Sequence, residues 1–154
     1  MFRPYDRVWF RGVRMNRRTK RMLKWAEKRA GFTFNVAQGS YNGNAVAASA
    51  GTHSGGGSLD LGMAGVSKAN RVKAVRALKD AGFAAWYRKP SQGFSPHVHA
   101  QAFGDREMAA SGKAQRASFD RGRDGLAYDR RDNTYRPKPK RGFSFTLNKP
   151  KVRK

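Results

Sequence analysis

The sequence predicts an α+β fold, with a small antiparallel sheet and flanking helices. Helix-like and strand-like segments are mixed along the chain, in the order helix, strand, loop, strand, helix, strand, strand and terminal helix. The 154 residues are enough for one domain with a hydrophobic core of its own, and no internal repeat is present. We therefore expect one central domain, carried by these elements.

The first predicted helix covers residues 17–30. Asn16 can cap its N-terminus, Gly31 can end it in a left-handed conformation, and its small and apolar residues share one face with Leu23. Residues 32–36 then alternate between apolar and polar side chains, which indicates a strand.

A long loop and a second helix follow. Residues 39–57 are small, polar and rich in glycine, and loops of this length are usually functional. Residues 58–63 indicate another strand, and Ser67 can cap a helix that runs to about residue 81. The apolar face expected for this helix consists of Val72, Val75, Leu78 and Ala81.

The second half of the chain predicts two more strands, residues 83–87 and 97–103, joined by a segment rich in turn-forming residues. A short helix is expected to begin at Asp105, and residues 121–133 are typical of a loop. The segment 135–154 is too rich in proline and charge to fold alone, so we expect it to be disordered or docked on a partner.

Charge divides the chain into three regions. The net charge is +23, from 33 basic and 10 acidic side chains. Residues 1–31 hold 11 basic and 2 acidic side chains, and residues 135–154 hold 8 basic and none acidic, whereas residues 32–134 have a nearly ordinary balance. This charge favours an anionic partner, which is nucleic acid, an anionic membrane or an acidic wall polymer.

Aromatic residues alternate with arginines near the N-terminus, where Phe2, Tyr5, Trp9 and Phe10 occur among four arginines. Such a pattern can bind phosphates and stack on bases, or grip an anionic wall polymer or membrane. The simpler interpretation is that these aromatic side chains pack on the central domain while the arginines remain in water. Both interpretations stay open.

The sequence shows no membrane span, no secretory signal and no possible disulfide. No apolar run approaches the length of a membrane span, and the basic N-terminus is not followed by the apolar segment of a secretory signal. The chain has no cysteine, which excludes disulfides and thiolate metal sites. A target outside the membrane would therefore require delivery by a phage particle or by host lysis.

All three histidines belong to one pattern with an aspartate: His53 precedes Asp60 by seven positions, and His97 and His99 follow in a predicted strand. Residues two apart in a strand share a face, so the last two are either two ligands of one ion or one ligand and one neighbour. Asp60 lies between two leucines, and a buried carboxylate needs a cation or strong donors. Either part of the pattern alone is more often structural; together they predict a metal site.

Two segments resemble a known group of enzymes. Residues 51–60, GTHSGGGSLD, are similar to the SxHxxGxAxD signature of D-Ala-D-Ala metallopeptidases, and the HVH of residues 97–99 resembles the HxH motif of the wider LAS group. Further segments within residues 32–134 are similar to small peptidase-like proteins of actinobacteria and their phages. The resemblance implies a LAS/hedgehog-type metallopeptidase core.

The resemblance also implies roles for individual residues. Zinc would be held by His53, Asp60 and His99, with His97 as general base beside it. Many members carry a catalytic glutamate three residues before the last ligand, where this chain has Pro96. The amide of Gln38 and the phenol of Tyr41 are the nearest counterparts of the side chain that polarises the scissile carbonyl.

The function expected from these observations is a zinc peptidase that hydrolyses amide bonds in peptidoglycan stem peptides or cross-links. It would be an endolysin-like or virion-associated protein that acts at the extracellular cell wall. The alternative is a non-catalytic virion protein on the same fold, whose basic ends contact DNA, wall polymer or other virion subunits.

Overall fold

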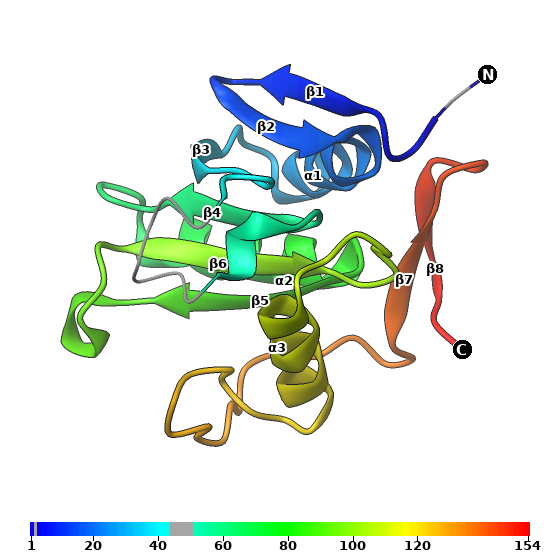
Figure 1. Cartoon of the computed structure of the whole chain (residues 1–154). Coiled ribbons are helices and arrows are strands. Elements are labelled where there is room, and N and C mark those ends of the chain that lie inside the picture. The colour runs from blue at the N-terminus through cyan, green and yellow to red at the C-terminus, as the bar shows by residue number, and fades with distance from the viewer. Residues whose placement is uncertain (2, 44–50) are drawn as a thin grey trace.

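The computed structural model describes residue 1, residues 3–43 and residues 51–154 (Figure 1). These residues form an α+β fold with a central four-stranded antiparallel sheet, which confirms the predicted class. The sheet has the order β3-β4-β6-β5, and two further hairpins, β1–β2 and β7–β8, lie outside it. The sheet strands are β3 (Asn35–Gln38), β4 (Ser58–Gly62), β5 (Phe83–Arg88) and β6 (His97–Ala102).

The two faces of the sheet differ in chemistry because side chains alternate along each strand. On one face, residues such as Leu59 and Val98 join the main hydrophobic core, together with residues of α1 (Arg17–Ala30) and α2 (Lys68–Asp80). The other face carries the polar residues of β4 and β6 and is partly covered by α3 (Ala110–Asp120) (Figure 1). The candidate site lies on this second face.

The first two helices begin where the sequence predicts. Asn16 accepts a hydrogen bond from the Thr19 backbone and Gly31 ends α1 with φ 85°, while Ser67 caps α2. The predicted apolar face of α2 is wrong at Val72, which is 49% exposed. Leu78 and Ala81 are buried and Val75 packs against the core as predicted, and Ala74 and Ala77 complete the face that contacts α1 and β5.

Two other boundaries differ from the sequence expectation. The strand expected at residues 32–36 lies at β3, three residues later at its start. The helix expected from Asp105 begins at Ala110, because the Asp105 carboxylate accepts hydrogen bonds from the Glu107 backbone and from Asn16 and so holds a turn. Asp105 is only 2% exposed, so these hydrogen bonds are shielded from water and stabilise the turn.

The C-terminal segment is ordered, contrary to the expectation of disorder. Strands β7 (Arg141–Ser144) and β8 (Lys149–Val152) form a hairpin, and Phe143 is buried in the main core at 2% exposure. The Arg21 guanidinium donates to the Phe145 carbonyl at 2.9 Å, which ties the hairpin to α1. The segment cannot fold alone, but it has a partner surface on its own domain.

The N-terminal segment forms the hairpin of β1 (Arg7–Phe10) and β2 (Val13–Asn16) next to α1 (Figure 1). Val8 and Phe10 pack against the core, whereas Trp9 is 72% exposed, so the packing interpretation holds for part of the aromatic set. Phe2 lies outside the described residues. In the part of the chain that the structure describes, no helix is long and apolar enough to cross a bilayer.

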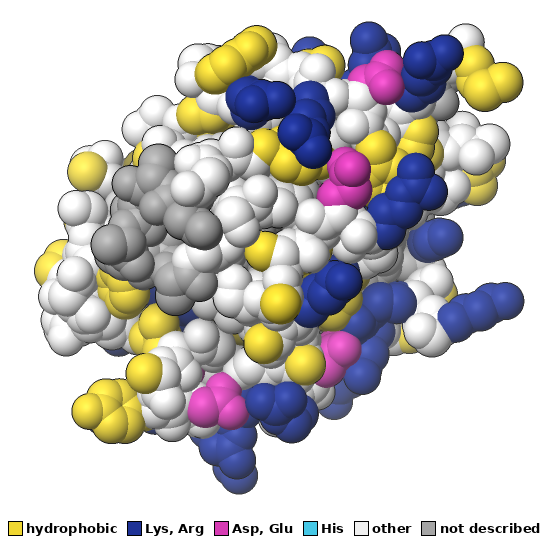
Figure 2. Space-filling model, in the orientation of Figure 1, with side chains coloured by type: hydrophobic (Ala, Val, Ile, Leu, Met, Phe, Trp, Pro, Cys, Tyr) yellow, Lys and Arg dark blue, Asp and Glu magenta, His cyan; other side chains and the backbone are white. Residues whose placement is uncertain are grey.

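The surface retains the excess of positive charge. Figure 2 shows one face, on which Lys and Arg side chains are spread over much of the described surface and Asp and Glu side chains are fewer. The hydrophobic core beneath draws on the N-terminal, central and C-terminal regions alike, through Met15, Leu59 and Phe143. The two basic ends therefore pack as parts of the same folded unit as the candidate site.

Candidate metal centre

The candidate centre is built by the register between β4 and β6. Asp60 is paired with His99 across these antiparallel strands, and directly opposed residues have neighbouring side chains. His53 approaches from a short 3-10 turn, Thr52–Ser54, which follows Gly51 in a left-handed conformation with φ 77°. Three segments that are distant in the sequence thus bring their side chains to one point.

A single carboxylate oxygen is the focus of this group. Asp60 Oδ1 lies 2.7 Å from His99 Nδ1, 3.2 Å from His53 Nε2 and 3.7 Å from His97 Nε2. All three histidines predicted from the sequence are therefore next to the predicted aspartate. The structure brings this constellation together as expected.

Backbone carbonyls fix the orientation of two of the imidazoles. His53 Nδ1 lies 2.7 Å from the Gly39 carbonyl and His97 Nδ1 lies 2.8 Å from the Ser95 carbonyl. A ring nitrogen that faces a carbonyl must carry the proton, so Nε2 of each ring is left with its lone pair. In both rings this is the nitrogen that faces Asp60, which suits a metal ligand at His53 and a proton acceptor at His97.

Two glutamines hold the remaining imidazole. His99 Nε2 lies 2.7 Å from Gln115 Oε1 and 2.8 Å from Gln101 Nε2. When Nε2 donates its proton to the Gln115 carbonyl oxygen, Nδ1 has a free lone pair on the side of Asp60. The Gln115 oxygen therefore favours the tautomer in which His99 is a ligand through Nδ1, whereas the Gln101 amide nitrogen, a donor, favours a lone pair on Nε2 and a proton on Nδ1.

Burial and hydrogen bonding set the charges in the centre. Burial alone would raise the pKa of the Asp60 carboxyl, but the adjacent His53 and His99 imidazoles outweigh it and hold this pKa well below its usual range. Burial lowers the pKa of His99, so its imidazole stays neutral near pH 7. A carboxylate beside the neutral His99 imidazole is an ionisation state that metal binding requires.

The donor set fits a metal ion. One ligand atom from each of His53, Asp60 and His99 lies within 4.8 Å of the others, and all three side chains are largely buried. A tetrahedral ion with bonds of about 2.0–2.2 Å separates its ligand atoms by roughly 3.3–3.6 Å, and Asp60 Oδ1 lies slightly closer than this to His99 Nδ1, at 2.7 Å, and to His53 Nε2, at 3.2 Å. These three residues could hold a metal ion.

The centre opens into a cleft of about 830 Å³, within the range of small-molecule sites. Asp60, His97 and His99 line the cleft, whereas His53 is fully buried behind them. Apolar side chains such as Phe94 and Leu126 form other parts of the wall. A ligand in the cleft can therefore reach the carboxylate and the His97 imidazole.

The two predicted carbonyl-polarising residues are placed differently. Gln38 is paired with Asp60 in the β3–β4 register and lines the cleft. Tyr41 instead donates its hydroxyl to Glu107 at 2.7 Å and accepts from Asn16 at 3.0 Å, and burial together with Glu107 raises its pKa. The structure thus brings Gln38 to the centre and directs the Tyr41 hydroxyl into another polar network.

Three residues of the site were not anticipated from the sequence: Gln101, Gln115 and Arg88. Gln101 could have been found, because it lies two positions after His99 and so shares its face of β6. Arg88, opposite His97 in the β5–β6 register, is 2% exposed, lines the cleft and donates to the Asp124 carbonyl, and burial lowers its pKa to about 10. Gln115 comes from α3, and no local signal places it here.

Comparisons with protein-family models, with curated proteins and with solved structures found no match to this chain.

Proposed function

We propose that this chain is a zinc-dependent peptidase of the LAS type that hydrolyses amide bonds in peptidoglycan stem peptides or cross-links. The observation that carries the proposal is the contact of one buried carboxylate, Asp60, with two inward-facing imidazoles, at the wall of a cleft that also contains His97. The segment similarities at residues 51–60 and 97–99 support the same family.

His53, Asp60 and His99 would hold the zinc ion. The donor set of two imidazoles and one carboxylate is that of an open catalytic zinc site. The chemistry that zinc supplies in such a site is polarisation of a carbonyl group and a lower pKa for a water molecule. The Gly39 carbonyl orients His53, and Gln115 with Gln101 orients His99.

His97 is the proposed general acid and base. Its Nε2 lone pair faces the centre at 3.7 Å from Asp60 Oδ1, so it can take a proton from water and return it to the leaving amine. Neither glutamate competes for this role, because Glu107 accepts from Tyr41 and Glu27 forms an ion pair with Arg11 at 2.7 Å. Gln38 would donate an amide hydrogen bond to the developing oxyanion.

The test combines metal analysis with hydrolysis of purified peptidoglycan, with products identified by mass. We expect the zinc-loaded protein to release peptide fragments by amide cleavage. His97→Ala should abolish turnover and keep the metal, whereas His99→Ala should lose both. A folded protein that binds no zinc, or that gives no products after zinc addition, would refute the proposal.

A second candidate is a non-catalytic virion protein on the same fold. The net charge of +23 favours it, since such a charge suits contact with DNA or with neighbouring anionic subunits. It predicts a stable zinc-loaded protein without hydrolysis of any peptidoglycan preparation. In either case we propose that the protein acts at the cell wall or in a virion, delivered by the phage particle or by host lysis.

A further inference from the structure

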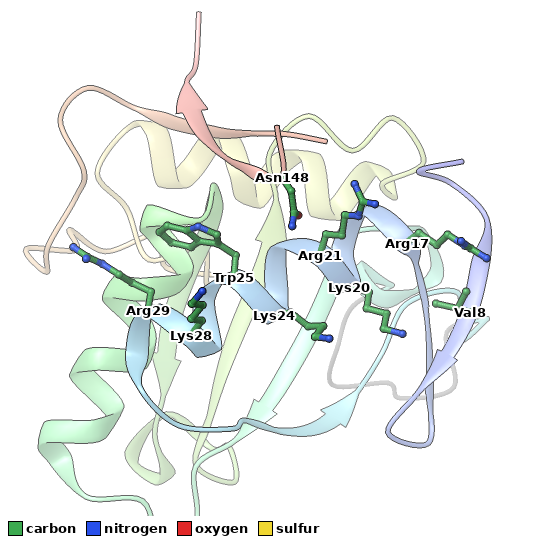
Figure 3. Close-up of a pocket in the computed structure, with 9 residues that line it drawn as sticks. All are labelled: Val8, Arg17, Lys20, Arg21, Lys24, Trp25, Lys28, Arg29 and Asn148. Carbon is green, nitrogen blue, oxygen red and sulfur yellow. The ribbon is translucent and has the colours of Figure 1, made fainter. Parts of the chain in front are cut away.

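A groove on the opposite side of the core from the metal centre runs along α1. It has a volume of about 960 Å³ and is lined by Val8, Arg17, Lys20, Arg21, Lys24, Trp25, Lys28, Arg29 and Asn148. Figure 3 shows the cationic side chains following one another along α1, with Val8 of β1 at one end and Asn148 of the β7–β8 turn facing the helix. The two basic ends of the chain therefore meet at this groove.

The two central lysines of the groove, Lys24 and Lys28, have no nearby carboxylate among the described residues. Six of its lining side chains are cationic, and no Asp or Glu of the described residues lines it. Arg17 and Arg29, near its two ends, each have one carboxylate at 4.0 Å, and within the described part of the chain no carboxylate lies within 4.0 Å of Lys24 or Lys28. Lys20 extends over the Phe10 ring at 4.7 Å.

The helix tolerates this arrangement at a cost to its own stability. Lys20, Lys24 and Lys28 are spaced four residues apart, and like charges at this spacing repel one another on a helix surface. The acidic residue of α1, Glu27, points to the other side, where it pairs with Arg11. This repulsion destabilises the helix, and an external anion bound along the row of lysines would relieve it.

The shape of the charge distribution suggests a linear ligand. The cations extend from residue 17 to residue 29, roughly 18 Å along the axis, in steps of about one helical turn. A compact anion would meet one or two of them, whereas a flexible chain of phosphodiesters can meet the whole row. The central cations are lysines, and a lysine ammonium, unlike the planar guanidinium of arginine, does not require its anion to bind in one fixed geometry.

The groove can recognise a charged backbone, but it has few side chains that could stack on or hydrogen-bond to nucleic-acid bases. Sequence-tolerant binding of single-stranded nucleic acid uses successive aromatic platforms. Here Trp25 is the aromatic residue among those that line the groove, and it is half-buried against the core. Asn148 is the single amide.

We propose that the α1 groove binds a linear phosphodiester polymer of the bacterial cell wall, of the poly(glycerol phosphate) type. The choice of a wall polymer over a nucleic acid rests in part on the proposed function, which places the protein at the wall. Binding there would hold the cleft near peptidoglycan while leaving the metal centre free for the stem peptide.

The test measures binding of defined poly(glycerol phosphate) to the full chain, beside single-stranded DNA with the same number of phosphates. The variant is Lys24→Gln/Lys28→Gln, and the matched control is Lys68→Gln/Lys73→Gln, which removes two exposed lysines from α2. We expect the groove variant to lose at least about tenfold in affinity and to reduce the salt slope of log K by roughly 1.4. The control should change affinity less than twofold.

A second readout uses Trp25, whose fluorescence should respond to the polymer in the parent chain and lose that response in Trp25→Phe. Equal losses in the groove variant and the control would overturn the proposal, because binding would then be diffuse. Tenfold tighter binding of the DNA would overturn the choice of a wall polymer. Measuring with chelator-treated protein separates this result from the proposed peptidase activity, because polymer binding needs no metal.

Discussion

The metal centre and the α1 groove treat charge in opposite ways. In the centre, three imidazoles surround a single carboxylate, and backbone or side-chain oxygens hold each ring in place. In the groove, six cations line one helix, and its two central exposed lysines, Lys24 and Lys28, have no carboxylate within 4.0 Å among the described residues. The difference supports the proposals that the centre holds one small cation and that the groove binds an external polyanion.

The largest expected effect concerns the β7–β8 hairpin, whose turn carries the groove residue Asn148. Phe143→Ala should lower the free energy of unfolding by about 3–5 kcal/mol, because it removes a fully packed aromatic side chain from the core. Denaturant titration measures the change. Leu147→Ala in the same hairpin is the control, with an expected change within about 0.5 kcal/mol, since Leu147 is 64% exposed. Equal effects would mean that the hairpin is not part of the core.

The second prediction concerns zinc affinity and tests the metal centre separately from the groove. Asp60→Asn should weaken zinc binding by more than about 100-fold, because loss of a ligand exceeds the 10–100-fold typical of losing an outer partner. The protein should also lose the thermal stabilisation that zinc gives, while its affinity for polyanions stays unchanged. Calorimetric titration measures the zinc affinity, and Asp129→Asn, at a carboxylate outside the proposed ligand set, serves as the control. Zinc affinity within a few-fold of the parent chain would exclude Asp60 as a ligand.

A third comparison separates the two residues proposed to polarise the carbonyl. Gln38→Ala should lower kcat by about 100-fold if its amide donates to the oxyanion. Tyr41→Phe should have a much smaller effect, because the Tyr41 hydroxyl is engaged by Glu107 and Asn16. Steady-state kinetics on a soluble stem peptide measures both. A larger loss in Tyr41→Phe would mean that this hydroxyl leaves its network during catalysis.

The smallest effect has the opposite sign. Lys24→Glu should raise the free energy of unfolding by a few tenths to about 1 kcal/mol, because two like-charge pairs on α1 become favourable pairs. Thermal unfolding at low salt detects it. Lys113→Glu in α3 has one basic neighbour at helical spacing, Arg116 three positions later, and should show a smaller gain. Destabilisation by Lys24→Glu would contradict the view that the groove charges oppose the fold.

The sequence predicts the metal centre better than the groove, for physical reasons. His97, His99 and Asp60 occur in short segments whose strand periodicity decides which side chains share a face, so a local pattern was sufficient. Gln115 could not be anticipated, because only the packing of α3 brings it to His99. Tyr41 was misleading because its hydroxyl has a stronger partner in Glu107, 66 residues away in the sequence.

The ends of the chain show the complementary case. Their basic character was evident, but the hairpin of β7 and β8 depends on burying Phe143 in a core built by other segments, which no local property of the tail reveals. Helix α1 was predicted with its caps, since Asn16 and Gly31 act locally. The groove along it exists only once β1 and the β7–β8 turn lie beside that helix.

The central claim is that His53, Asp60 and His99 hold zinc. Anomalous diffraction at the zinc edge from crystals of the zinc-loaded protein tests it most directly. The account predicts one strong peak at about 2.0–2.2 Å from His53 Nε2, His99 Nδ1 and an Asp60 carboxylate oxygen, with His97 beside it and not bound. No peak at this position, or a peak bound through His97 in place of His53 or His99, would contradict it.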